Sequence, residues 1–170
     1  MSTKTESIAA LEKARKAIDD AFAPMPDGAL AYLKPGDDYA IGGIVIHLIQ
    51  SLDGYLATLE ALGQAGYRDT EGPAEDESVV EGQLAHARLG LAPAERRATF
   101  AEMAEKQQRL GQLAAKANDE EFARLVGVSY PGDDVPYPTS VALVLQWMTE
   151  HFTEHVPHAR QLFAEWQTAR

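Results

Sequence analysis

The amino-acid sequence predicts an all-α protein built around a four-helix bundle. Three observations favour this fold class. Four long segments repeat apolar residues with the period of a helix, prolines and glycines concentrate between these segments, and sustained two-residue alternation is absent outside a short stretch at 126–130. The 170 residues suffice for one sizeable core. We therefore expect residues 1–170 to form a single helical-bundle domain with long loops.

The first half of the chain supplies two of the four helices. Ser7–Phe22 has apolar residues at helical spacing, and the prolines and glycine of 23–28 end this helix. Residues 29–33 are predicted to form a short helical turn. The second long helix is Ala40–Leu62, and the glycine pair Gly42–Gly43 near its start permits close approach of a neighbouring helix.

The second half supplies the other two helices and one shorter segment. Gly63–Pro73 is rich in turn residues and is predicted to be a loop, whereas Glu75–Leu89 is predicted to be an extra short helical segment. Pro93 suits a first helical position, so the third long helix is Ala94–Ala117. The fourth helix is predicted to run from an N-cap at Thr139 to about residue 168.

Two smaller features lie between the third and fourth helices. Glu120–Leu125 is predicted to add one more helical turn after the break at residues 118–119. Ser129–Pro138 contains three prolines within eight residues, which exclude a regular helix. We expect this segment to be an extended loop that leads into the last helix.

Composition excludes several classes of function. The formal net charge of −11 argues against a nucleic-acid-binding surface, which needs clustered Lys and Arg, and equally against an anionic membrane surface. The chain has no cysteine, so disulfides, thiolate zinc sites and cysteine nucleophiles are excluded. The N-terminal residues lack the apolar core of a signal peptide, and no apolar run reaches transmembrane length. We expect a cytoplasmic protein.

Three of the five histidines lie within residues 150–158 of the fourth helix. His151 and His155 are four residues apart and therefore project from one face of that helix, on a stripe that also contains His158. On the second helix, His47 lies on an apolar stripe. Because apolar stripes face the axis of a bundle, these imidazoles are expected to converge in its interior. Three converging nitrogen ligands suit a divalent cation and leave coordination positions open.

Other interpretations of these residues remain open at the level of sequence. His47 fits a hydrogen-bonded core histidine, and the pair of histidines four apart fits a solvated helix face. Trp147, one turn before His151, fits either the lining of a pocket or the core. Pro157 is predicted to bend the helix near the histidines, by a kink that either opens space for a ligand or is merely tolerated. The same kink would bring His158 into reach as an additional ligand.

Several further side chains are candidates for supporting roles. Tyr130 and Tyr137 precede the last helix and fit either a lid over the site or a cap on the end of the bundle. The carboxylates of Asp53, Glu150 and Glu154 fit either acceptors for imidazole N–H groups or solvated surface groups. His86 lies in the weakly helical segment between the second and third helices and is expected at the surface.

Three stretches together resemble the DinB-like (DinB/YfiT-type) family of metal-dependent helical bundles. Leu30–His47 resembles the Pro/Gly loop that leads into the family's second helix and its first metal histidine. Phe122–Thr139 resembles the family's extended loop before the last helix, and Trp147–Leu162 resembles its closing pattern with two histidines four apart. The resemblance covers about Leu30 to Trp166, and the order and spacing of these motifs carry it.

The resemblance implies that the metal ligands are His47, His151 and His155. Many relatives have a glutamine three residues after the last ligand histidine, where this chain has His158. A second register is therefore open, in which His158 is the last ligand and Glu154 precedes it by four residues. The first register is preferred because it supplies histidine at both positions.

The resemblance also implies a function. We expect a metal-dependent enzyme, either a hydrolase or a transferase acting with a low-molecular-weight thiol such as bacillithiol or mycothiol, on a small-molecule substrate. The ion is expected to be zinc or nickel, with iron or manganese as alternatives. The other hypotheses are a non-catalytic stress-response or small-molecule-binding bundle of the same fold, and a purely structural bundle whose histidines are hydrogen-bonded core residues. Family members of this type are expected to form homodimers.

Overall fold

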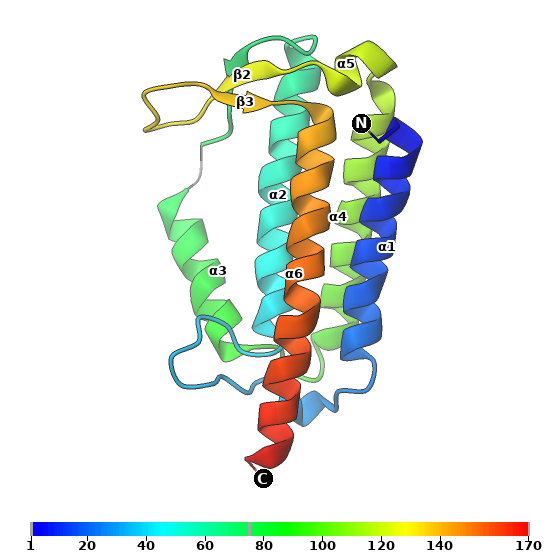
Figure 1. The fold of residues 1–170 in the computed structure, drawn as a ribbon. Helices are drawn as coiled ribbons and strands as arrows, with labels where there is room; N and C mark the ends of the chain where they lie inside the picture. The colour runs from blue at the N-terminus through cyan, green and yellow to red at the C-terminus, as the bar shows by residue number, and fades with distance from the viewer. Residues whose placement is uncertain (1, 75, 170) are drawn as a thin grey trace.

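The computed structural model describes residues 2–74 and 76–169 and contains the predicted four-helix bundle (Figure 1). The four bundle helices are α1 (Lys4–Phe22), α2 (Gly43–Gln64), α4 (Arg96–Lys116) and α6 (Val141–Thr168). Helix α1 packs along α6, and α2 packs along α4 and α6. The shorter elements are η1 (Asp27–Ala29), β1 (Thr70–Glu71), α3 (Glu77–Leu89), α5 (Asp119–Ala123), β2 (Val126–Ser129) and β3 (Tyr137–Thr139).

The apolar stripes predicted from the sequence form the core. Leu11 and Ile18 of α1, Leu48 and Leu52 of α2 and Phe152 of α6 are fully buried. Complete burial of such a side chain stabilises the fold by about 1.5–3 kcal/mol relative to its exposure. The histidines of α2 and α6 lie beside these residues, so packing of the core fixes the distance between the two helices that carry them.

Several helix boundaries differ from those predicted. Helix α1 begins three residues earlier than Ser7, because Thr3 and Glu6 form a capping box in which each side chain bonds the other's backbone N–H. Helix α4 begins at Arg96, and Pro93 lies in the preceding turn instead of at a first helical position. The short helical turn expected at 29–33 lies slightly earlier, at Asp27–Ala29.

The start of α2 is in close contact with the end of α3. A Cβ atom on Gly43 would lie 1.7 Å from the carbonyl oxygen of Ala87, so only glycine fits there. The backbone N–H of Ala40 donates to the same carbonyl at 3.0 Å. The helical segment predicted at 75–89 is present as α3, although its predicted first residue, Glu75, lies outside the described residues.

A small three-stranded sheet lies across the end of the bundle where α6 begins (Figure 1). Strand β2 pairs in parallel with β1 and antiparallel with β3. The alternation at 126–130 corresponds to β2, but the predictions of loops at Gly63–Pro73 and Ser129–Pro138 missed β1 and β3. These strands have two and three residues, too few for a periodic signal, and the partner of β1 is distant in sequence.

The sheet also corrects the predicted start of the last helix. Thr139 is fully buried in β3 and is not the N-cap. The N-cap is Ser140, whose hydroxyl accepts a hydrogen bond from the backbone N–H of Leu143 at 3.1 Å. Helix α6 then continues through Pro157 to Thr168. The bend expected at this proline stays a prediction. No helix within 2–74 or 76–169 is both long and apolar enough to cross a membrane.

Candidate metal centre

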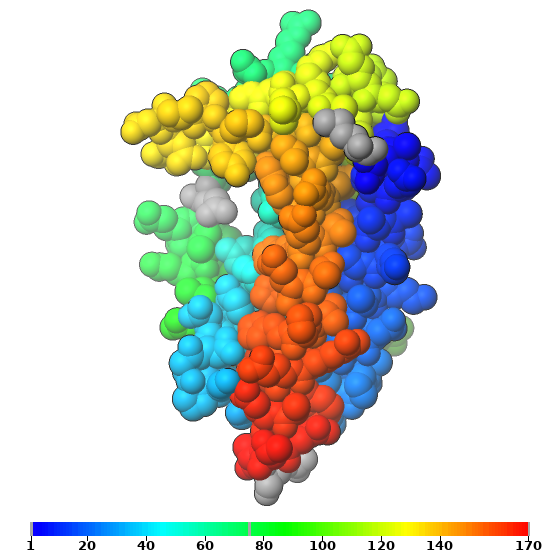
Figure 2. Space-filling view, in the orientation of Figure 1, coloured from blue at the N-terminus to red at the C-terminus, as the bar shows by residue number. Residues whose placement is uncertain are grey.

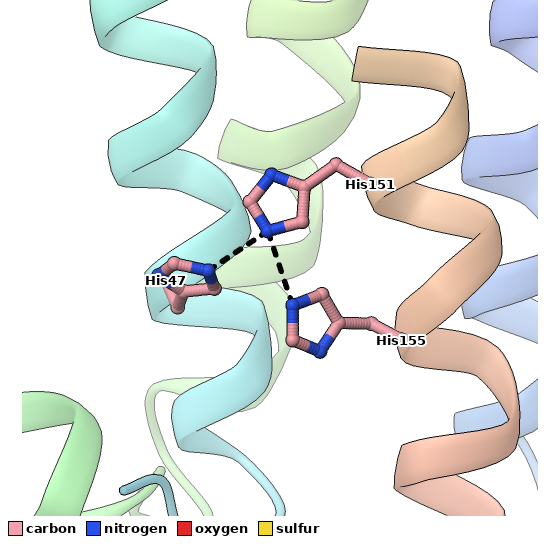
Figure 3. Close-up of side chains that lie close together, drawn as sticks. All are labelled: His47, His151 and His155. Atoms are coloured by element: carbon pink, nitrogen blue, oxygen red, sulfur yellow. Dashed lines mark hydrogen bonds between the residues drawn. The ribbon is translucent and has the colours of Figure 1, made fainter. Parts of the chain in front are cut away.

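Helices α2 and α6 bring three histidines together (Figure 3). His47 lies one turn after the start of α2, and His151 and His155 lie on successive turns of α6. The two helices run in opposite directions side by side, so their facing sides present the three rings to one point. One coordinating nitrogen from each ring lies within 4.8 Å of the other two.

The Nε2 atoms are the nitrogens that meet. Nε2 of His151 lies 2.8 Å from Nε2 of His47 and 3.1 Å from Nε2 of His155. In a neutral imidazole this nitrogen carries either one proton or one lone pair. A single proton cannot be aimed at both neighbours, and a single lone pair cannot accept two well-aligned protons. Hydrogen bonds therefore cannot satisfy the cluster completely.

The surroundings keep these histidines neutral. Burial, followed by the proximity of His151, lowers the pKa of His47 to about 4. Burial, followed by the proximity of His151 and His47, lowers the pKa of His155 to about 3. Burial also lowers the pKa of His151, against the opposing charge of Glu154. At neutral pH the rings therefore offer lone pairs, the form in which imidazole coordinates a metal ion.

The loop before α2 contributes a residue that sequence reasoning missed. The ring of Tyr39 stacks on His47 with 4.5 Å between ring centroids and 17° between planes. Backbone bonds from Ile41 to Tyr32 and from Gly42 to Leu30 hold this loop against the segment that precedes it. Tyr39 thereby covers one face of the His47 ring and limits its orientation.

The sequence pattern of the DinB superfamily matches residues 10–159. This chain belongs to the DinB superfamily. The match covers α2 and α4 completely and most of α1 and α6, and the predicted family resemblance is confirmed. A comparison with curated proteins finds no match to this chain.

Two solved structures share the fold. YfiT from Bacillus subtilis, described as a probable metal-dependent hydrolase with an unusual four-helix bundle topology, is 19% identical, with a TM-score of 0.73 over 96% of this chain and 87% of that one. A protein from Streptococcus pneumoniae is 12% identical, with a TM-score of 0.64 over 99% of this chain and 92% of that one. At these identities the comparison shows a DinB/YfiT-like bundle fold.

His158 lies beside the proposed ligand His155 on α6. Its Nδ1 lies 3.4 Å from Nδ1 of His155, on the side of that ring opposite to the Nε2 cluster. Its Nε2 lies 3.3 Å from Oδ2 of Asp37 in the loop before α2. His158 thus connects His155 to a carboxylate that the sequence analysis did not single out, because Asp37 reaches the site only through the path of its loop.

The remaining candidates occupy varied positions. Trp147 is half-buried, packs against the core and, with Tyr130 and Tyr137, lines a pocket beside His151. Glu150 and Glu154 lie at the rim of the same pocket. Asp53 and His86 have other partners. The carboxylate of Asp53 is paired with Lys106, and His86 is exposed, as expected, 3.7 Å from a carboxylate oxygen of Glu95.

Proposed function

We propose that this DinB-superfamily protein is a metal-dependent enzyme, a hydrolase or a low-molecular-weight thiol transferase. Its proposed ligands are Nε2 of His47, His151 and His155. The convergence of these three nitrogens beside an open pocket is the observation that carries the proposal. Homodimer formation stays a prediction, to be measured by light scattering.

The donor set fits a divalent ion of the late first transition row. Zinc binds imidazole nitrogen at about 2.0–2.1 Å, so two nitrogens of a tetrahedral site lie roughly 3.3 Å apart. The distances of 2.8 and 3.1 Å between Nε2 atoms are near this spacing, and all three ligand nitrogens lie within 4.8 Å of one another. Imidazole ligands suit zinc, nickel and iron, whereas manganese favours oxygen ligands, and cellular availability contributes to the choice among these metals.

A bound ion would supply Lewis acidity, lowering the pKa of a water or thiol held in an open coordination position. The protein's own residues prepare the site. The helices fix the three imidazoles, and the low pKa values of His47 and His155 keep these two rings neutral. Coordination through Nε2 leaves the proton of His155 on Nδ1, from which it donates to Nδ1 of His158. His158 in turn donates from Nε2 to the carboxylate of Asp37.

Turnover by metal-loaded protein tests the proposal. Ester substrates assay hydrolysis, and small thiols offered with a bimane electrophile assay thiol transfer. We expect activity in one assay, lost on chelation, restored by zinc or nickel, and absent from His151→Ala. His86→Ala is the matched control and should retain full activity, because His86 lies on the surface of α3. If loaded wild-type protein turns over neither substrate class, the non-catalytic binding bundle replaces the enzyme as the better account.

A further inference from the structure

A pocket of about 570 Å³ adjoins the histidine cluster, and His151 forms part of its wall. Figure 2 shows the surface hollowed beneath the arm formed by β2, β3 and the loop between them, beside the orange part of α6. Four aromatic side chains from separate parts of the chain line this pocket: Tyr55, Tyr130, Tyr137 and Trp147. The pocket therefore has aromatic walls and a candidate metal ligand at one side.

Two of these rings contact Trp147. The centroid of Tyr137 lies 5.7 Å from that of Trp147 at 61° between planes, and the centroid of Tyr55 lies 6.4 Å away at 32°. The fourth ring, Tyr130, lies within 3.3 Å of Thr58 through its hydroxyl. Tyr137 keeps 54% of its surface exposed, so one aromatic wall remains accessible to a ligand.

The ionised side chains that line this pocket are both acidic. The carboxylates of Glu150 and Glu154 line the pocket together with the rings. The amide of Gln146 donates to Glu150 at 2.8 Å, but a neutral amide leaves the negative charge in place. Among the described residues, no Lys or Arg lines this pocket. In the pocket without metal, a carboxylate or phosphate group would meet two like charges and no compensating Lys or Arg. The proposed divalent ion on His151 would add positive charge at that side of the pocket only.

We infer that this pocket selects an organic ammonium ion, with its cationic group in the pocket against the Trp147 and Tyr137 rings and beside the two glutamates. Aromatic faces attract quaternary and methylated ammonium groups, and the attraction increases when the ion is partly desolvated. The net charge of −11 adds a favourable long-range field for cations. The inference deepens the proposed function and rests on it for the reactive end of the substrate, which lies toward His151. The substrate class is therefore a cationic amine that carries a neutral reacting group.

Choline and its neutral isostere 3,3-dimethylbutan-1-ol test this selection directly. The two molecules have the same shape and differ in charge, so their affinity ratio isolates the cationic contribution. Binding is followed by calorimetry and by tryptophan fluorescence in a Trp166→Phe background, which leaves Trp147 as the remaining tryptophan. We expect choline to bind about tenfold more tightly than the isostere. The double variant Glu150→Gln/Glu154→Gln should reduce this ratio to about twofold or less.

The matched control is Glu12→Gln/Glu105→Gln, which removes the same charge from exposed positions on α1 and α4. Its affinity ratio should equal that of wild type. Equal binding of choline and the isostere by wild-type protein overturns the inference, as does an unchanged ratio in the pocket variant. Measurements on chelated and zinc-loaded protein separate the two proposals. Cation selection in protein that binds no metal supports the pocket and contradicts the enzyme, whereas metal binding without cation selection contradicts only the pocket.

Discussion

Replacement of Asp37 by asparagine tests whether the hydrogen-bonded connection from His155 through His158 to Asp37 strengthens metal binding. Asp37 accepts from Nε2 of His158, whose Nδ1 faces Nδ1 of His155. Asparagine retains an acceptor oxygen and loses the negative charge. A hydrogen bond to a charged group contributes about 1.5–3 kcal/mol, against about 0.5–1.5 kcal/mol for a neutral pair. The difference of about 1 kcal/mol predicts about fivefold weaker zinc binding by Asp37→Asn.

His158→Phe should have a larger effect than Asp37→Asn. It leaves the Nδ1–H of a half-buried His155 without its acceptor. Loss of such a partner typically reduces metal affinity about ten- to a hundredfold. Both affinities can be measured by competition with a chromophoric chelator. The absorption spectrum of the cobalt-substituted protein reports the ligand geometry separately from fold stability.

Asp38→Asn is the matched control for Asp37→Asn. Asp38 is the neighbouring residue, and its side chain is exposed, 3.9 Å from a guanidinium nitrogen of Arg88. Its replacement removes the same charge without touching His158. If the two asparagine variants weaken zinc binding equally, only the overall charge matters and the hydrogen-bonded connection has no effect. If Asp37→Asn leaves both affinity and cobalt spectrum unchanged, Asp37 does not support the ligand at all.

Two further predictions concern the stability of the bundle without metal. The lowered pKa values of His47 and His155 mean that the unfolded chain binds up to two more protons below about pH 6.5. Chelated protein should therefore lose on the order of 4 kcal/mol of stability between pH 7 and pH 5. The free energy of unfolding in urea measures this loss, which should largely disappear in His47→Gln/His155→Gln. If this double variant loses as much stability between pH 7 and pH 5 as wild type, protonation of the two histidines is not the cause. Gly43→Ala should cost about 3 kcal/mol or more, because its Cβ would overlap the carbonyl of Ala87. Gly54→Ala in the same helix, where a Cβ has open space, should instead stabilise by about 0.5–1 kcal/mol, and equal effects of the two would refute the steric argument.

The bundle could be predicted from the sequence because its helices are long and periodic. The convergence of His47 with His151 followed from their places on apolar stripes, since such stripes must face a common axis. The first residues of α1 and α6 depend on the N-caps Thr3 and Ser140. In each case a single side chain fixes where the helix begins, and a neighbouring residue is an equally suitable cap by sequence.

The surroundings of the histidines could not be predicted in the same way. Tyr39 and Asp37 belong to an irregular loop, whose path depends on backbone bonds to residues near Leu30 and to the end of α3. Strand β1 pairs with β2 across more than fifty residues, and neither length nor periodicity marks it. The aromatic pocket depends on this sheet, because Tyr137 lies in β3 and Tyr130 directly follows β2. These features arise from tertiary contacts that carry no local signal.

Metal content tests the central claim most directly. Protein purified without a histidine tag and analysed for its elements should contain close to one divalent ion per chain. The variant His151→Ala/His155→Ala should contain almost none, while His86→Ala should match wild type. Added zinc or nickel should raise the melting temperature of chelated wild-type protein and leave that of the double variant unchanged. Wild-type protein that is free of metal, with a melting temperature indifferent to every divalent ion tested, would contradict the account.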